Sequence, residues 1–155
     1  MDSEILIGWA ARDVSTTKPV DIPGQFHMRI SQGIIDPITV SALVIDNGED
    51  RVIFLSADIV LIRSCLLDKI RAKVADLNPE IPVLKILMNA THTHTGPTTY
   101  GDNPDLMSGS STPSPQELPD SGIEIASADE YQDFFIAQAA EAVAERHVGA
   151  FEDGG

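Results

Sequence analysis

The sequence predicts an α/β fold, a mixed sheet with a βαβ unit and flanking helices. Two runs rich in β-branched residues, 37–46 and 51–58, are joined by Asn47-Gly48-Glu49-Asp50, and an Asn-Gly pair is a strong hairpin signal. An amphipathic helical pattern over 62–77 then precedes a further apolar run at 83–90. A strand, a helix and a strand in that order are typical of a crossover between parallel strands.

Length and charge limit the classes of protein to which the chain could belong. Its 155 residues suffice for one domain with a real core, so we treat 1–155 as a single unit. The formal net charge of -14 argues against nucleic acid and anionic membranes as partners. The acidic start lacks the basic region of a signal peptide, and no apolar run reaches the roughly 20 residues of a membrane span. We therefore expect a cytoplasmic protein.

The N-terminal part of the chain is expected to contain a strand and a long loop. Residues 4–11 read as the first strand, and 18–33, with two prolines and two glycines, read as a loop. Loops of this length are often functional. His27 and Arg29 lie in it, and for His27 a structural role is the simpler interpretation.

The run at 51–58 is apolar at both alternating sets of positions. That pattern suits a strand covered on both faces of its sheet. The run ends at Asp58. If the βαβ interpretation is right, Asp58 and His92 emerge at the same edge of the sheet, where ligands of α/β proteins usually bind.

The remaining segments carry weaker signals. Cys65 is the sole cysteine and stands beside two leucines, so we expect a small buried hydrophobe rather than a nucleophile. Residues 96–126 form an irregular loop insertion, either a lid or a flexible segment. A last helix is expected over 128–147, where Ser127 with Glu130 fits a capping box. His147 would suit the dipole at the end of that helix, with a metal role as the alternative.

The candidate site is the stretch Asn89 to Pro97, which contains the pair His92 and His94. On extended backbone, side chains two residues apart point to the same face, so both imidazoles could address one ion or one substrate atom. Neutral imidazole is a common zinc ligand, and Asp58 could orient a ring from behind. The alternative is that both histidines only bond the loop backbone.

The amino-acid sequence of this stretch also resembles a known family motif. Thr91-His92-Thr93-His94-Thr95-Gly96-Pro97 closely resembles the Thr-His-Thr-His-Ser-Gly-Pro signature of the neutral/alkaline non-lysosomal ceramidase family. Other segments resemble elements of that family in the same order, and together they span nearly the whole chain: Gly8 to Val14, Ile38 to Val44, Val52 to Asp58 and the helix at 128–147. The Thr-His repeat is the specific part of this match.

The resemblance implies a zinc-dependent amidase in which a metal-bound water attacks the N-acyl carbonyl of a ceramide-like, lipid-like or other small-molecule substrate. It makes His92 a zinc ligand and places His94 in the same site, near the water or the substrate oxygen. The family's remaining ligands are a further His, a Glu and a Tyr, and they come from sequence beyond this chain. The resemblance thus implies the N-terminal portion of a longer catalytic domain, with a missing C-terminal segment or an oligomeric partner completing the site.

A function from a different class also fits the sequence. The chain could be a non-catalytic α/β module that keeps this fold and binds a ligand or a partner without a complete metal site. Stoichiometric zinc that is lost in His92→Ala would favour the hydrolase, and the absence of bound metal at micromolar zinc would favour the module.

Overall fold

The computed structural model describes residues 5–25, 29–100, 124–145 and 148–150. Of residues 148–150 only the backbone is described. It contains a five-stranded sheet with the strand order β4-β3-β2-β1-β5. The strands are β1 (Leu6–Asp13), β2 (Thr39–Asp46), β3 (Arg51–Ala57), β4 (Ile86–Ala90) and β5 (Val148–Ala150). The helices are α1 (Ser64–Leu77), a short 3-10 turn (Val83–Lys85) and α2 (Ala128–Ala144). The predicted α/β class and mixed sheet are confirmed.

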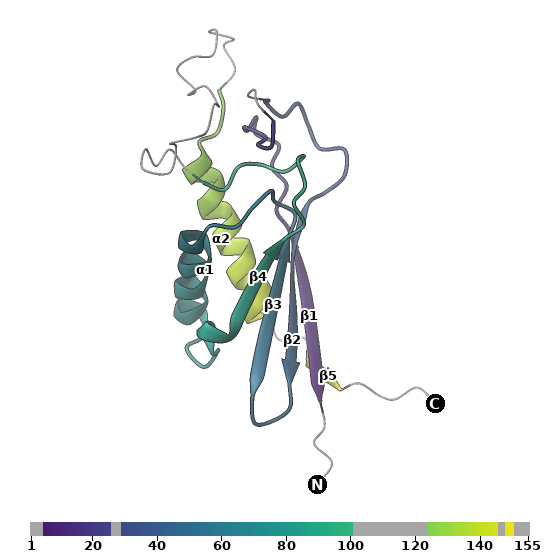
Figure 1. Cartoon of the computed structure of the whole chain (residues 1–155), viewed down its shortest axis with the longest axis vertical. Coiled ribbons are helices and arrows are strands. Elements are labelled where there is room, and N and C mark those ends of the chain that lie inside the picture. The colour runs from purple at the N-terminus through teal and green to yellow at the C-terminus, as the bar shows by residue number, and fades with distance from the viewer. Residues whose placement is uncertain (1–4, 26–28, 101–123, 146–147, 151–155) are drawn as a thin grey trace, which may run out of the picture.

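The strand pairing follows the predicted hairpin and crossover. β2 and β3 pair antiparallel through the Asn47-Gly48 turn, where Gly48 takes a φ of 84°. β3 and β4 are parallel and are connected through α1. The carboxyl ends of these two strands therefore lie at one edge of the sheet, as Figure 1 shows near its centre.

Both helices pack on the same face of the sheet (Figure 1). The core between them is lined from the sheet by Val40, Ala42, Ile53, Leu55 and Ile86, and from the helices chiefly by Leu66, Ile70, Val74, Phe135 and Ala139. Within each helix these residues recur every four positions, which places them on one face of an amphipathic helix. The Ser127 side chain accepts a hydrogen bond from the Glu130 amide, which confirms the predicted start of α2.

Two expectations about burial are wrong. β3 is covered on one face only, since Phe54 is 39% exposed while its neighbours Ile53 and Leu55 are buried. Cys65 is exposed rather than buried. It precedes Leu66, the first residue of the buried stripe of α1, and one residue is about 100° of rotation around a helix.

Candidate functional site

The backbone after β4 runs against the segment that follows β3. The amide of Thr91 donates to the carbonyl of Ala57 at 2.9 Å, and the amide of His92 donates to that of Ile59 at 3.1 Å. These two bonds extend the parallel pairing past the ends of the strands. Asp58 and His92 therefore lie at the same edge of the sheet, as the βαβ interpretation predicted.

The two motif histidines meet through their Nε2 atoms. The Nε2 atoms of His92 and His94 are 3.4 Å apart, and the ring centroids are 5.0 Å apart at an interplanar angle of 75°. The Nδ1 of His92 lies 2.6 Å from the carbonyl oxygen of Val60. Because a carbonyl can only accept, Nδ1 carries a proton, and in the neutral ring the Nε2 of His92 presents its lone pair towards His94.

The convergence of the rings does not arise from extended backbone as predicted. Strand β4 ends at Ala90, and His92 has a φ of 63°, in the left-handed region. This conformation costs a residue with a Cβ roughly 1–3 kcal/mol. Strain of this kind tends to persist where the surrounding structure requires it. In His92 the strained backbone is found together with the contact between the imidazole and the carbonyl of Val60.

His94 rests against the loop that precedes β2. Gly24 lies so close to its ring that a Cβ at this position would stand 2.5 Å from Nδ1. Arg29 donates to the carbonyl of His94 at 2.5 Å and to the carbonyl of Pro23 at 3.1 Å. The predicted functional loop thus contacts the site, through Gly24 and Arg29. A glycine and an arginine in a long loop gave no sequence signal for these contacts.

The carboxylate of Asp58 is held by threonines rather than by an imidazole. It accepts from the backbone amide of Thr39 at 2.9 Å, from the Thr39 hydroxyl at 3.2 Å and from the Thr91 hydroxyl at 3.2 Å. The ring of His92 takes its orientation from Val60 instead. Asp58 therefore forms a hydrogen bond with neither imidazole in the structure. It holds Thr91, the residue that precedes His92, and so acts on His92 through the backbone.

Gly96 explains how tightly the motif folds onto this edge. A Cβ at Gly96 would lie 2.6 Å from the backbone oxygen of Asp58, closer than real contacts allow. Within the motif, the hydroxyls of Thr93 and Thr95 are 2.7 Å apart. Glycine in the signature is thus required by a close backbone approach.

An apolar cavity of about 340 Å³ adjoins the motif. It lies between the loop that precedes β2 and the end of the motif, and its lining includes Ile22, Ile34, Ile35, Ile38, Thr95 and Pro97. Ile35 is 96% exposed at its rim. An apolar cavity beside polar groups is the usual form of a small-molecule site.

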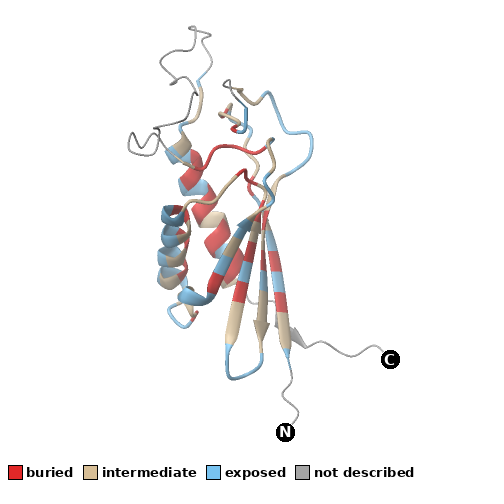
Figure 2. Ribbon diagram, viewed as in Figure 1, coloured by how far each residue is buried: buried red, intermediate tan, exposed pale blue. Residues whose placement is uncertain are grey.

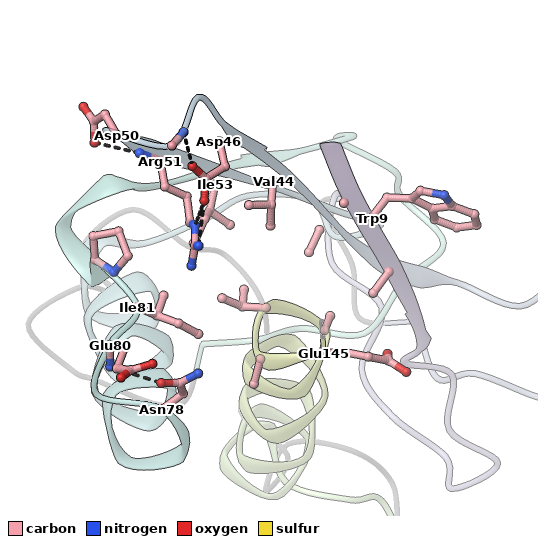
Figure 3. Close-up of a pocket in the computed structure, with 18 of the residues that line it drawn as sticks. Trp9, Val44, Asp46, Asp50, Arg51, Ile53, Asn78, Glu80, Ile81 and Glu145 are labelled. Atoms are coloured by element: carbon pink, nitrogen blue, oxygen red, sulfur yellow. Dashed lines mark hydrogen bonds and ion pairs between the residues drawn. The ribbon is translucent and has the colours of Figure 1, made fainter. Parts of the chain in front are cut away.

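A larger cavity of about 580 Å³ lies at the opposite end of the sheet (Figure 3). Its lining includes Val44, Ile53, Ile81 and the ion pair of Asp46 with Arg51. The Oδ2 of Asp46 and the Nη2 of Arg51 are 2.6 Å apart. None of the histidines that the structure describes lines this cavity. Its ionisable side chains are carboxylates and Arg51, whereas both described histidines lie at the other end of the sheet, so we assign the candidate site to the smaller cavity and the motif.

The histidine pair fits part of a zinc centre. Two Zn–N bonds of about 2.0–2.1 Å at a tetrahedral angle place the nitrogens roughly 3.3–3.4 Å apart, and the two Nε2 atoms are 3.4 Å apart. Among the described residues, however, no group of three or more His, Cys, Asp or Glu side chains could hold a metal ion. The part of the chain that the structure describes thus supplies two ligand nitrogens. His27 and His147 lie outside it, so neither interpretation of these residues is tested.

Comparison with known proteins places the fold. Neither a protein-family model nor a curated protein matches the sequence. The neutral ceramidase from Pseudomonas aeruginosa matches the structure with a TM-score of 0.69 at 15% identity, over 92% of this chain and 21% of that chain. This is a ceramidase-like fold. A ceramidase complexed with C2 matches with the same TM-score at 16% identity, over 91% of this chain and 20% of its own.

The chain spans about one fifth of the length of the ceramidases that it matches. At this identity the likeness establishes the fold and leaves activity to be argued from the site. No helix in the described ranges has the length and hydropathy needed to cross a membrane.

Proposed function

We propose that the chain is the N-terminal part of a zinc-dependent amide hydrolase that resembles neutral ceramidase. Three findings support this proposal: the ceramidase-like fold, the Thr-His motif at a sheet edge, and the apolar cavity beside it. The observation that carries it is the 3.4 Å approach of the Nε2 atoms of His92 and His94. Two imidazoles held this way are arranged as a pair of zinc ligands would be.

The residues of the site divide the work between them. His92 binds zinc through Nε2, while its Nδ1–H remains on the Val60 carbonyl, an outer contact that fixes ring orientation and raises ligand basicity. A bound zinc ion would polarise an amide carbonyl and lower the pKa of a water. The Nε2 of His94 faces the same point. It can hydrogen-bond the attacking water or the substrate oxygen, and it is also close enough to bind the ion as a second nitrogen, which is why its loss is expected to weaken zinc binding.

Asp58 is proposed to position the motif. Its carboxylate ties Thr39 of β2 to Thr91, and Thr91 is adjacent to His92 in the chain. Loss of this carboxylate would loosen His92 without removing a ligand atom. Displacements of about 1 Å are enough to impair such sites.

The substrate is proposed to carry an apolar acyl group. Half of the residues that line the cavity beside the motif are aliphatic or proline, and the other half are Gly33 and polar residues that include Asp36. The aliphatic half suits an acyl chain. His94 directly precedes Thr95 of this lining, so the amide of a bound acyl compound is proposed to face it. The substrate class is therefore a lipid-like or other small N-acyl compound, and ceramide is one member of it.

Zinc binding tests the site directly. The chain is extended in frame by the coding sequence that follows it, so that the remaining ligands are present. It is dialysed against micromolar zinc, and its metal content is measured for the wild type, His92→Ala, His94→Ala and the control Asp46→Asn, which alters a carboxylate at the opposite end of the sheet. We expect stoichiometric zinc in the wild type and in the control, and loss in both motif variants. Equal zinc content in all four proteins would contradict the proposal.

A second function is favoured by a specific observation. The described residues supply only two ligand nitrogens, and such a pair can also serve as a neutral hydrogen-bonding unit in a ligand- or partner-binding module. The same dialysis separates the two. No bound metal at micromolar zinc in the wild type, while the fold is intact by circular dichroism, favours the binding module.

A further inference from the structure

One face of the sheet carries a continuous row of exposed apolar side chains. Trp9 of β1 pairs with Leu43 of β2, Leu43 pairs with Phe54 of β3, and Phe54 pairs with Leu87 of β4. Their exposed fractions are 69%, 39%, 39% and 52% in that order. Directly paired residues on one face are close neighbours, so the four side chains form a band across four strands.

The neighbouring rows on this face are also uncharged. On one side of the band lie Ile7, Ile45 and Val52 in register, and on the other lie Ala11, Ser41, Ser56 and Asn89. None of these three rows contains an ionisable side chain, although the chain has 24 acidic and 10 basic residues. We call these three rows the open face.

The open face is bare because both helices lie on the other side. The ribbon views place α1 and α2 together on one face (Figures 1 and 2). In Figure 3 the indole of Trp9 points away from the cavity between the sheet and the helices. Contiguous apolar surfaces of this kind usually mark contacts with other polypeptide or with a membrane, or a ligand groove. The net charge of -14 disfavours an anionic membrane.

A second copy of the chain is poorly suited to cover the open face. Four strands about 4.8 Å apart, each contributing five residues of about 3.3 Å, give a footprint of about 300 Å². Stable interfaces bury about 800 Å² per partner, so the face is small for an association that must offset lost translational freedom. Two copies, each with a net charge of -14, would also repel one another.

A covering layer that belongs to the same longer polypeptide does not have to offset the translational freedom lost on association, because the covalent link to the sheet raises its effective concentration. It also need not carry the same net charge. The matched neutral ceramidase has about four fifths of its length outside the region that this chain covers. We propose that the open face is covered by further polypeptide of a longer ceramidase-like protein. That layer packs an uncharged apolar face against Trp9, Leu43, Phe54 and Leu87.

The proposal is independent of zinc and of catalysis, since the band of large side chains lies away from the Thr-His motif. The two meet only at the polar row, where Asn89 donates to the Ser56 hydroxyl at 3.1 Å. The covering layer would therefore border the candidate site. A failure of zinc binding would leave this proposal unaffected.

Trp9 provides the test, because it is the only tryptophan in the sequence. Two proteins are compared: the 155-residue chain, and the same chain extended in frame by the coding sequence that follows it. Tryptophan emission, acrylamide quenching, binding of the apolar dye ANS and molar mass by light scattering are measured for both. For the 155-residue chain we expect a monomer with red-shifted emission, strong quenching and bound ANS.

For the extended chain the emission of Trp9 is obtained as the difference between the wild type and Trp9→Phe, and we expect it to be blue-shifted and protected from acrylamide, with loss of ANS binding. In the 155-residue chain, Leu43→Thr/Phe54→Thr should lose ANS binding with unchanged helix content. The matched control Leu77→Gln/Phe134→Gln alters residues on the helices that are 47% and 39% exposed, and it should keep ANS binding. This pair places the dye on the open face rather than on exposed apolar residues in general.

Three results would overturn the proposal. The first is a Trp9 that stays exposed in the extended chain. The second is a dimeric 155-residue chain with Trp9 protected, which would make a second copy the occupant. The third is a genuine stop codon directly after the last codon of the 155-residue chain.

Discussion

Gly24→Ala is the most informative single change, because Gly24 contacts His94 and takes a left-handed conformation. Its φ is 98°, and a Cβ would stand 2.5 Å from Nδ1 and 2.7 Å from Cγ of the His94 ring. Ordinary contact begins at 3.4 Å. The ring must therefore retreat by about 0.9 Å, the difference between 2.5 and 3.4 Å, or the loop must move away by as much.

The expected loss of stability has two parts. A left-handed φ costs an alanine about 1–2 kcal/mol, and forcing a methyl into an occupied space costs about 1–3 kcal/mol more. Gly48→Ala isolates the first part. Gly48 has a φ of 84°, but a Cβ there meets nothing within 4 Å.

The assays separate strain from displacement. Urea unfolding should show Gly24→Ala to be less stable than Gly48→Ala by about 1–3 kcal/mol. Long-range ¹H–¹⁵N spectra of the imidazoles should shift for His94 in Gly24→Ala and stay unchanged in Gly48→Ala. Zinc affinity should fall by about 10–100-fold in Gly24→Ala alone, as for other losses of support around a ligand.

Identical behaviour of the two glycine variants would refute this reasoning. It would mean that the contact of Gly24 with His94 has no energetic or positional consequence. An unchanged His94 spectrum together with weaker zinc binding would contradict it as well, because displacement of the ring is the stated cause.

Three further predictions concern the motif, the hairpin and the core. His92→Gly should be more stable than His92→Ala by about 1 kcal/mol in urea unfolding, the reverse of the usual order, because residue 92 has a φ of 63°. The hydrogen bond from the amide of Gly48, and next the one from Arg51, lower the pKa of Asp46. This carboxylate therefore stabilises the fold above its unfolded pKa of about 3.9, and the contribution is lost as pH falls through the lower folded value. In Asp46→Asn, the free energy of unfolding should depend less on pH in that acid range. Tyr131→Phe should cost about 1–3 kcal/mol, because the buried hydroxyl donates to the carbonyl of Val14 at 2.8 Å and that acceptor would be left unpaired.

Local sequence signals predicted the elements that depend on local physics. The Asn47-Gly48 turn, the stripe of α1 and the cap at Ser127 each follow from neighbours within a few residues. The order of β3, α1 and β4 then brought Asp58 and His92 to one edge. These inferences needed periodicity and chain order only.

The details of the site depend on contacts between distant residues. Gly24 meets His94 across 70 positions and Val60 meets His92 across 32. Neither pairing has a periodic trace in the sequence. The left-handed φ of His92 likewise reflects what surrounds it, since only a few per cent of non-glycine residues adopt that region even though histidine is among the enriched ones.

The wrong expectation for β3 is itself informative about the molecule. A run that is apolar at both alternating sets of positions is what a strand needs when both faces are covered, yet the structure covers only the face with Ile53 and Leu55 and leaves Phe54 exposed. The same holds for Leu43 and Leu87 in register beside it. In a strand with one face open to solvent, the residues on that face are normally polar and alternate with apolar residues on the covered face. The sequence of these strands thus suits a sheet between two layers, and the second layer is the one that the open face is proposed to receive.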